Sequence, residues 1–421
     1  MLRLLQFVKP GISSKNQLHS IKSDTHTMAG KLPRIESIDL LRGFAIILMA
    51  LDHVRDYFHA DYFFYDPADM TQTNGAVFFT RWITHFCAPI FMFLAGTSAF
   101  LVGERKTKNE LAGFLLKRGL WLMLLETVVI NFAWSFNPSY PFFRLQVIWA
   151  LGLSMVILSA FVYLPFKVIL ALGLIMLFGH NLLDNIHATG NSFMDILWGQ
   201  LHERKRFVIG NRLIATGYPI LPWFAIMALG YCFGSLYKKT VNAGLRKKYL
   251  LIMGSLAIAL FLLLRGINMY GDMSPWAIQD STILSLCSFL NTTKYPPSLL
   301  YGLMTLGPAL LMLALLEKPL NSMGKIIIVF GRVPLFFYIL HLYLIHALAT
   351  IAVVLSGRPW TDMVTITNLN AKDSPWLKGY GFTLWQTYLI WMLVVALLYP
   401  LCKWYDRYKT NHKEKWWLSY L

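Results

Sequence analysis

Long apolar stretches, separated by short polar segments, alternate along the chain from residue 38 to its C-terminal region. Most are about as long as the roughly 17–25 residues that a helix needs to cross a bilayer. We place them at 38–58, 76–102, 111–133, 145–163, 166–183, 218–237, 249–269, 297–316, 326–355 and 384–402. The pattern therefore predicts an all-α, polytopic membrane protein with about ten transmembrane helices. Pro334 interrupts the run 326–355, whose length suits a tilted helix or one with a re-entrant piece.

The two ends of the chain are polar. Residues 1–33 are basic and lack a helical apolar stripe, so we predict a disordered cytoplasmic lead, with Met28 as an alternative start. We find no cleavable signal peptide, because no short apolar core with a small-residue cleavage site follows the first basic residues. The rest divides into a transmembrane domain at 34–405 and a basic cytoplasmic tail at 406–421.

Composition excludes a soluble globular protein. Hydrophobic residues make up 56% of the 421 residues and charged residues only 14%, against about 45–50% and 25% in soluble domains. The net charge of +17 would suggest nucleic acid as a partner in a soluble chain. Here the basic residues lie between apolar runs, so we expect no nucleic-acid partner.

The distribution of Lys and Arg predicts the orientation. With the N-terminus placed inside, 26 of the 38 basic residues flank inner helix ends. The positive-inside rule then puts both termini in the cytoplasm. The outer segment 184–217, with four basic residues, argues mildly against this.

Neither a metal nor nucleotide hydrolysis is implied by the motifs. The four cysteines form no Cys-x-x-Cys pair and no zinc spacing, and we interpret them as small apolar residues: Cys87, Cys232, Cys287 and Cys402. No His-Glu-x-x-His or Gly-x-x-x-x-Gly-Lys pattern is present.

Ionisable side chains inside membrane helices are costly, which makes each one a functional candidate. In the first run, Asp39 and Arg42 share a helical face at the cytoplasmic end and can pair, while His53 lies about 16 Å deeper. We interpret His53 as a general base whose tautomer is held by Asp52 or Asp56; the alternative is a neutral interface histidine.

Other polar groups complete the candidate chemistry. His59, at the start of the next outer loop, competes with His53 for the role of base. Arg81 and His85 are four residues apart on one helical face and form a second polar wall. Glu126, deep in the third run, is interpreted as structural or as a group matched with a cation. His341 follows Tyr338 by three residues, and its spacing to the next histidine disfavours a metal site on that helix alone.

Basic residues gather at the predicted cytoplasmic mouth. Their ordinary role is topology and contact with anionic lipid, and a phosphate-rich cofactor would use the same groups. They are Arg42, Arg105, Lys106, Lys117, Arg118, Lys325 and Arg332. For Asp39 and Arg42 a topogenic ion pair is the alternative role.

Five segments in order carry a family resemblance: RIESIDLLRGFAIILMALDH at 34–53, CAPIFMFLAGTS at 87–98, LPWFAIMALGYCFG at 221–234, KYPPSLLYG at 294–302 and GRVPLFFYILHLYLIH at 331–346. Together they resemble bacterial membrane proteins of the DUF1624 type, related to heparan-alpha-glucosaminide N-acetyltransferase. The Ser-Ile-Asp-x-x-Arg-Gly opening also resembles the wider transmembrane acyltransferase superfamily. The resemblance covers nearly all of the chain from residue 34 onward.

The resemblance implies a membrane acyltransferase that takes an acetyl group from cytoplasmic acetyl-CoA and delivers it to a sugar amine or hydroxyl on the outer face. Family members place an Asn at the end of the first span and a His in the following outer loop at the transfer centre. The first position matches His53 here, so this chain departs from the family's lysosomal enzyme at that position, and the second matches His59 only with a gap. The resemblance further implies a multi-pass protein of the bacterial inner membrane, with a glycan or another envelope molecule as acceptor.

These considerations give two sets of candidate residues. Candidate catalytic residues are His53, His59, Asp52, His85 and Arg81. Candidate cofactor-binding residues are Asp39, Arg42, Arg118, Arg332 and His341. Direct transfer and a two-step route through an acetyl-histidine both stay open. The rival function is a proton-coupled secondary transporter or lipid-linked sugar carrier, with a membrane scaffold as a third option. The oligomeric state is left open, with a homodimer as one option.

Overall fold

The computed structural model describes residues 35–364 and 375–419, and helices dominate both ranges. The predicted lead at 1–33 lies outside the described residues. The first helices and turns are α1 (Glu36–Phe58), η1 (Ala60–Phe63), α2 (Gly75–Thr84), α3 (Cys87–Gly103), α4 (Lys108–Leu125), the π-helical η2 (Glu126–Ile130), α5 (Asn131–Ser135), α6 (Val147–Phe161), α7 (Phe166–Gly179), η3 (His180–Leu183) and α8 (Phe193–Leu201).

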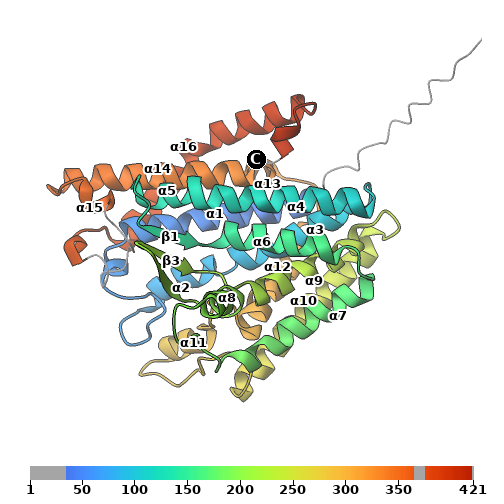
Figure 1. The fold of residues 1–421 in the computed structure, drawn as a ribbon, viewed down its shortest axis with the longest axis horizontal. Coiled ribbons are helices and arrows are strands. Elements are labelled where there is room, and N and C mark those ends of the chain that lie inside the picture. Colours follow the sequence, from blue (N-terminus) through green and yellow to red (C-terminus); the bar gives the residue numbers. More distant parts are fainter. Residues whose placement is uncertain (1–34, 365–374, 420–421) are drawn as a thin grey trace, which may run out of the picture. The chain divides into compact units, whose positions relative to one another are not determined.

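The second part of the chain continues the helical pattern (Figure 1). Its elements are α9 (Ile220–Phe233), η4 (Gly234–Tyr237), α10 (Ala243–Ile267), α11 (Thr282–Leu290), α12 (Leu299–Leu316), α13 (Ser322–Arg332), α14 (Pro334–Leu355), α15 (Thr361–Val364), η5 (Pro375–Leu377), α16 (Leu384–Asn411) and η6 (Trp416–Ser419). Because α16 runs to Asn411, the predicted boundary between domain and tail at 405 falls inside a helix.

Seven helical stretches among the described residues are long and apolar enough to cross a membrane. They are Gly75–Gly103, Phe166–Leu183, Ile220–Tyr237, Ala243–Ile267, Leu299–Leu316, Pro334–Leu355 and Leu384–Asn411. Helices also occupy the other predicted runs, but α6 has only 15 residues and α1 carries several charges, Asp39, Arg42, Asp52 and Arg55 among them. The count of about ten spans and the orientation of the termini therefore stay predictions.

The predicted run 326–355 is two helices. Arg332 ends α13, and Pro334 opens α14 at a position where the missing N–H of proline costs nothing. Val333 between them has φ −130° and ψ 48°, outside the helical region. The proline thus separates two helices instead of kinking one.

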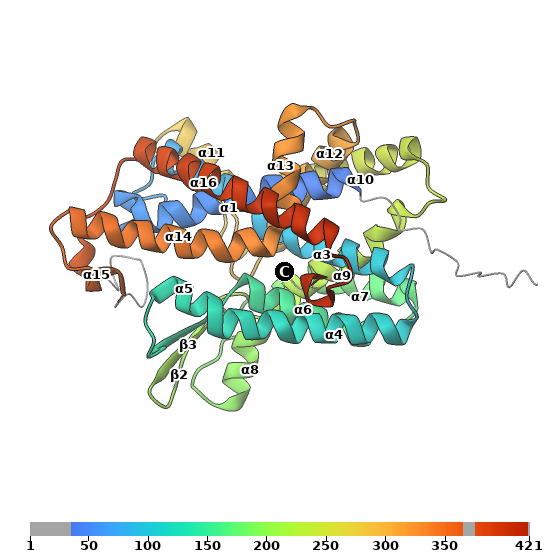
Figure 2. The ribbon, with the colours of Figure 1, turned by 90° about the horizontal axis from the view of Figure 1, so that it is seen from above.

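Helix α1 contacts many of the other helices in the described fold. It packs against α13, α14, α16, α3, α12 and α2, and most of its residues are buried. The other close pairs are α4 with α6, α3 with α9, α7 with α9, and α10 with α12 (Figures 1 and 2). An ionisable residue on α1 therefore lies inside the protein, where a polar partner must balance it.

A small sheet lies among the loops near α8 (Figure 2). Its strands are β1 (Phe142–Leu145), β2 (Arg206–Ile209) and β3 (Arg212–Thr216). The order is β1-β3-β2, with β1 parallel and β2 antiparallel to β3. The parallel pair ties the segment before α6 to the segment before α9.

Candidate functional site

A buried ion network lies at the C-terminal half of α1. Nη1 of Arg81 donates to both carboxylate oxygens of Asp52 at 2.8 Å, and Oγ1 of Thr84 donates to Oδ1 at 2.8 Å. Nη2 of Arg55, a residue only 1% exposed, reaches Oδ1 of Asp52 at 2.7 Å and Oδ1 of Asp56 at 2.8 Å. Two guanidinium groups thus face two carboxylates, and the network is close to neutral as a whole.

His53 is joined to a histidine from α14. Nδ1 of His341 lies 3.0 Å from the carbonyl oxygen of Phe337, which can only accept, so this nitrogen carries a proton. In neutral His341 the other nitrogen, Nε2, is then an acceptor, and it lies 2.7 Å from Nδ1 of His53. Nδ1 of His53 therefore donates, which leaves the lone pair on its Nε2. This hydrogen-bond network sets His53 as a proton acceptor.

Aromatic rings surround the histidine pair. The rings of His53 and His341 are nearly parallel, at 11°, and Trp134 and Tyr338 approach His53 edge-on at centroid distances of 5.0 and 6.1 Å. Both histidines are buried, His53 at 8% exposure and His341 at 0%. The packed rings limit rotation of the imidazoles, so the orientation of Nε2 is fixed by its surroundings.

The structure corrects one detail of the sequence interpretation. His341, not Asp52 or Asp56, holds the tautomer of His53, because neighbouring residues on a helix point in different directions and Asp52 turns toward Arg81. The cofactor-binding role predicted for His341 stays a prediction, and the residue contacts the candidate base.

His59 and His85 are placed apart from this pair. His59 ends α1, and burial lowers the pKa of its imidazole, whose Nδ1 has no partner among the described residues. The side chain of His85 is buried, its ring lies 5.5 Å from that of Tyr301, and its backbone carbonyl accepts from the Tyr301 hydroxyl at 2.6 Å. No described hydrogen bond or ring contact links either residue to His53.

Two of the predicted cofactor-binding arginines, Arg42 and Arg332, lie where α1 packs against α13. Arg42 pairs with Asp39 at 3.0 Å, as predicted, and also donates to Oγ of Ser98 at 3.1 Å and to the carbonyl of Gly331 at 3.3 Å. Arg332, which follows Gly331 in the sequence, lies 3.6 Å from Asp406 of α16. Arg118 lies on α4, which packs against α6 and α3. Asp39 and Arg42 thus lie against Gly331, the residue before Arg332, while Arg118 lies on a different helix.

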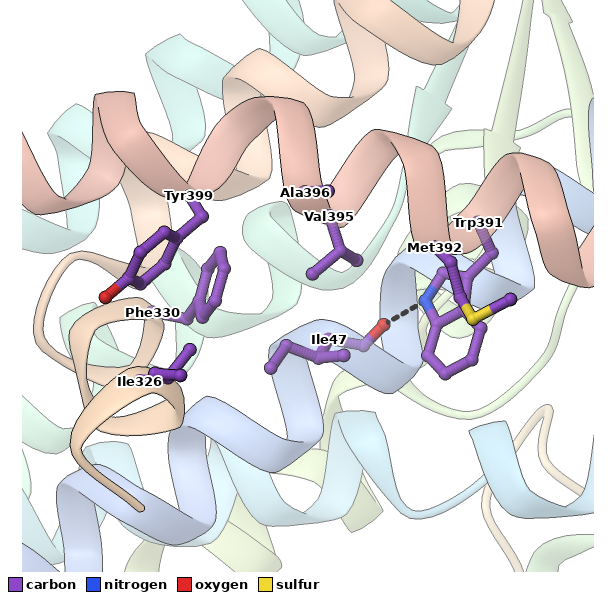
Figure 3. A pocket seen from close by; sticks show the side chains of 8 residues that line it. All are labelled: Ile47, Ile326, Phe330, Trp391, Met392, Val395, Ala396 and Tyr399. Atoms are coloured by element: carbon purple, nitrogen blue, oxygen red, sulfur yellow. Dashed lines mark hydrogen bonds between the residues drawn. The ribbon is translucent and has the colours of Figure 1, made fainter. Parts of the chain in front are cut away.

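An apolar groove opens between α1, α13 and α16 (Figure 3). Ile47 lies in its floor, and Nε1 of Trp391 donates to the Ile47 carbonyl at 2.8 Å. The other lining residues are Ile326, Phe330, Met392, Val395, Ala396 and Tyr399. Ile47 lies between Arg42 and His53 on α1, but the lining carries no charge that would hold a phosphate.

Residues 34–264, just over half of the chain, match the family model of the heparan-alpha-glucosaminide N-acetyltransferase catalytic domain. The chain belongs to the heparan-alpha-glucosaminide N-acetyltransferase family. No curated protein matches it. Membership supports a membrane acyltransferase, in agreement with the helical fold.

The matched segment of this family member contains only part of the site. Asp39, Arg42, Asp52, His53 and Arg81 lie within residues 34–264, while His341 and Arg332 lie beyond it. The bond between His53 and His341 spans 288 residues, so neither the family match nor local spacing reveals it.

Two further polar residues of this site were not predicted from the sequence. Thr84 binds Asp52, and Lys294, only 8% exposed, lies near enough to Asp52 to act on it electrostatically. The available signal for Lys294 was a lone basic residue beside the apolar run at 297–316. Thr84 offers no signal, because threonine is common in helices of all kinds.

Proposed function

We propose that this protein moves an acetyl group from acetyl-CoA in the cytoplasm to an amine or hydroxyl of a sugar on the opposite face of the membrane. The observation that carries the proposal is His53, buried in a family-matched segment, with its Nδ1 committed to His341 and its Nε2 left as a proton acceptor. A neutral imidazole positioned in this way is suited to general base catalysis. The proposal includes about ten membrane-spanning helices with both termini in the cytoplasm.

The proposed step follows from that geometry. Nε2 of His53 takes the proton of the acceptor N–H or O–H while the acceptor atom attacks the thioester carbon. The C–S bond then breaks, the acetyl group stays on the acceptor, and CoA leaves as the thiol after taking up the proton that Nε2 of His53 had accepted. The adjacent Asp52 carboxylate stabilises the positive charge that develops on the imidazole. Arg42 and Arg332 are proposed to hold the phosphates of CoA, because guanidinium groups bind phosphate through paired hydrogen bonds.

The test uses the full-length protein in detergent with acetyl-CoA and a panel of amino sugars. We expect His53→Ala to lower the release of CoA thiol by about 10²–10⁴-fold, the usual contribution of a general base. The control is the substitution His412→Ala at the end of α16. This variant should keep wild-type activity. Full activity of folded His53→Ala protein would refute the assignment.

Binding of the donor is measured separately. Acetyl-CoA should raise the unfolding temperature of wild type and of His53→Ala, because a ligand at about 100 times its Kd adds roughly 2.7 kcal/mol to stability. Absence of a shift at saturating acetyl-CoA, together with coupled proton flux in liposomes, would instead favour the secondary transporter.

A further inference from the structure

Three side chains that no part of the proposed reaction uses converge near the start of the segment between α7 and α8. They are His180 on η3, Asp184 just after it, and His202 at the end of α8. One ligand atom from each lies within 4.8 Å of the other two. His180 and His202 are both 2% exposed, so the cluster is buried.

Two of the three distances within the cluster are close to those between the ligands of a tetrahedral metal ion, and the third, between His180 and Asp184, is within 4.8 Å. Nδ1 of His180 lies 3.3 Å from Nε2 of His202, which lies 3.6 Å from Oδ1 of Asp184. Bonds of about 2.0–2.1 Å to zinc at tetrahedral angles separate two ligand atoms by about 3.3–3.4 Å. Only small movements of these side chains are needed to hold one ion.

The hydrogen bonding of the cluster is incomplete without a cation. Oδ1 of Asp184 is buried and has no hydrogen-bond partner among the described residues. A buried carboxylate oxygen without a hydrogen-bond donor destabilises the folded protein. A divalent ion between the three side chains would give that oxygen, and the two facing imidazole nitrogens, a shared partner.

A neighbour orients the carboxylate for this role. Nδ2 of Asn181 donates to Oδ2 of Asp184 at 2.8 Å, which leaves Oδ1 directed at the histidines. Oδ1 of Asn181 in turn accepts from the backbone N–H of Leu299 at the start of α12 at 3.0 Å. Such outer hydrogen bonds are the usual support of metal ligands.

We propose that His180, Asp184 and His202 bind one zinc-like divalent transition-metal ion, which fastens the segment 184–201 to the end of α7. Two imidazole nitrogens and one carboxylate oxygen favour zinc over Mg²⁺ or Ca²⁺, which prefer sets of oxygen ligands. Three protein ligands leave a fourth position for water. The sequence gives no hint of the site, because His180 and His202 are 22 residues apart. The proposal is independent of the proposed acetyl transfer.

The experiment measures metal content in the full-length protein, purified without chelator. We expect about one zinc per chain in wild type, and at least tenfold weaker zinc binding after chelation and titration in His202→Ala and in Asp184→Asn. The control is His187→Ala, because this neighbouring histidine has a 63% exposed side chain and pairs with Glu203. It should bind zinc like wild type.

Stability gives a second readout that does not depend on variants. Chelation should lower the unfolding temperature of wild type, and one equivalent of zinc should restore it, because an ion bound only by the folded state stabilises it. Wild-type protein that neither contains nor binds stoichiometric zinc overturns the proposal. So does zinc that is lost equally from His187→Ala.

Discussion

At the residue scale, the main energetic problem of this fold is the set of charges on α1. Asp52, Arg55 and Arg81 are nearly or wholly buried, and each depends on the others for compensation. Removing one member of a buried ion pair leaves an uncompensated charge, which costs about 3–5 kcal/mol. The network therefore makes the orientation of α1 against α2 sensitive to single substitutions.

Asp52→Asn should consequently destabilise the protein by about 3–5 kcal/mol, measured as the free energy of unfolding in detergent. The substitution keeps the shape of the side chain but leaves Arg55 and Arg81 facing one another with a single carboxylate, Asp56. In a double-mutant cycle with Arg81→Gln, we expect a coupling energy toward the upper end of the range of about 0.5–3 kcal/mol.

A partly exposed pair provides the control for this cycle. Glu104 and Lys238 lie 3.3 Å apart with side chains 35% and 42% exposed. Solvent screens this pair, so the cycle of Glu104→Gln with Lys238→Gln should give about 0–1 kcal/mol. Equal coupling energies for the two cycles would show that burial of Asp52 does not strengthen its ion pairs.

The sequence predicts the local half of the candidate site. The pairing of Asp39 with Arg42 follows from a spacing of three on a helix and is present. The contact of His53 with His341 joins helices 288 positions apart, and no periodicity encodes which distant helices meet. The predicted contact between Asp52 and His53 was wrong, because Asp52 adjoins His53 in sequence but its carboxylate pairs with Arg81.

At the element scale, the predicted apolar runs give helices, and the errors fall at chain breaks and polar loops. The split of 326–355 at Pro334 depends on whether proline kinks or begins a helix, which tertiary packing decides. The parallel pairing of β1 with β3 was not predicted, because its strands lie about 70 residues apart in short loop segments.

Helices α1 and α13 pack unusually closely, and two glycines permit it. A Cβ on Gly331 would lie 1.7 Å from the carbonyl oxygen of Asp39, and one on Gly43 would lie 2.3 Å from that of Ile327. Close backbone approach through small residues is a common way for membrane helices to pack. The contact also positions Arg42 against the Gly331 carbonyl.

Gly331→Ala should therefore destabilise the protein by roughly 1–3 kcal/mol, since the two helices must separate to admit the methyl group. The control is Gly113→Ala in α4, where an added Cβ meets nothing within 4 Å. Alanine there should stabilise the helix by about 0.5–1 kcal/mol. Thermal unfolding of both variants checks the prediction, and effects of the same sign would contradict it.

At the scale of the whole molecule, the proposed acetyl transfer requires a defined orientation of the loops across the membrane. Seven helical stretches among the described residues are long and apolar enough to cross a membrane, while α1 is largely buried and carries charges of the candidate site. Mean hydropathy alone does not identify such a helix as a membrane span, because its charged residues lower the mean hydropathy. Neighbouring helices shield those residues from lipid. The charge distribution still predicts an orientation, with the loop 103–110 inside and the segment 184–217 outside.

Cysteine labelling in sealed, oriented membranes tests this orientation. All four native cysteines are buried, so they should react slowly with an impermeant maleimide and give a low background. Single cysteines are introduced at two exposed positions, Lys106→Cys between α3 and α4 and Asn191→Cys before α8. We expect Asn191→Cys to react from outside and Lys106→Cys only after the membrane is permeabilised. Labelling of both from the same side would require an even number of crossings between them and would overturn the proposed transfer of an acetyl group across the bilayer as we have oriented it.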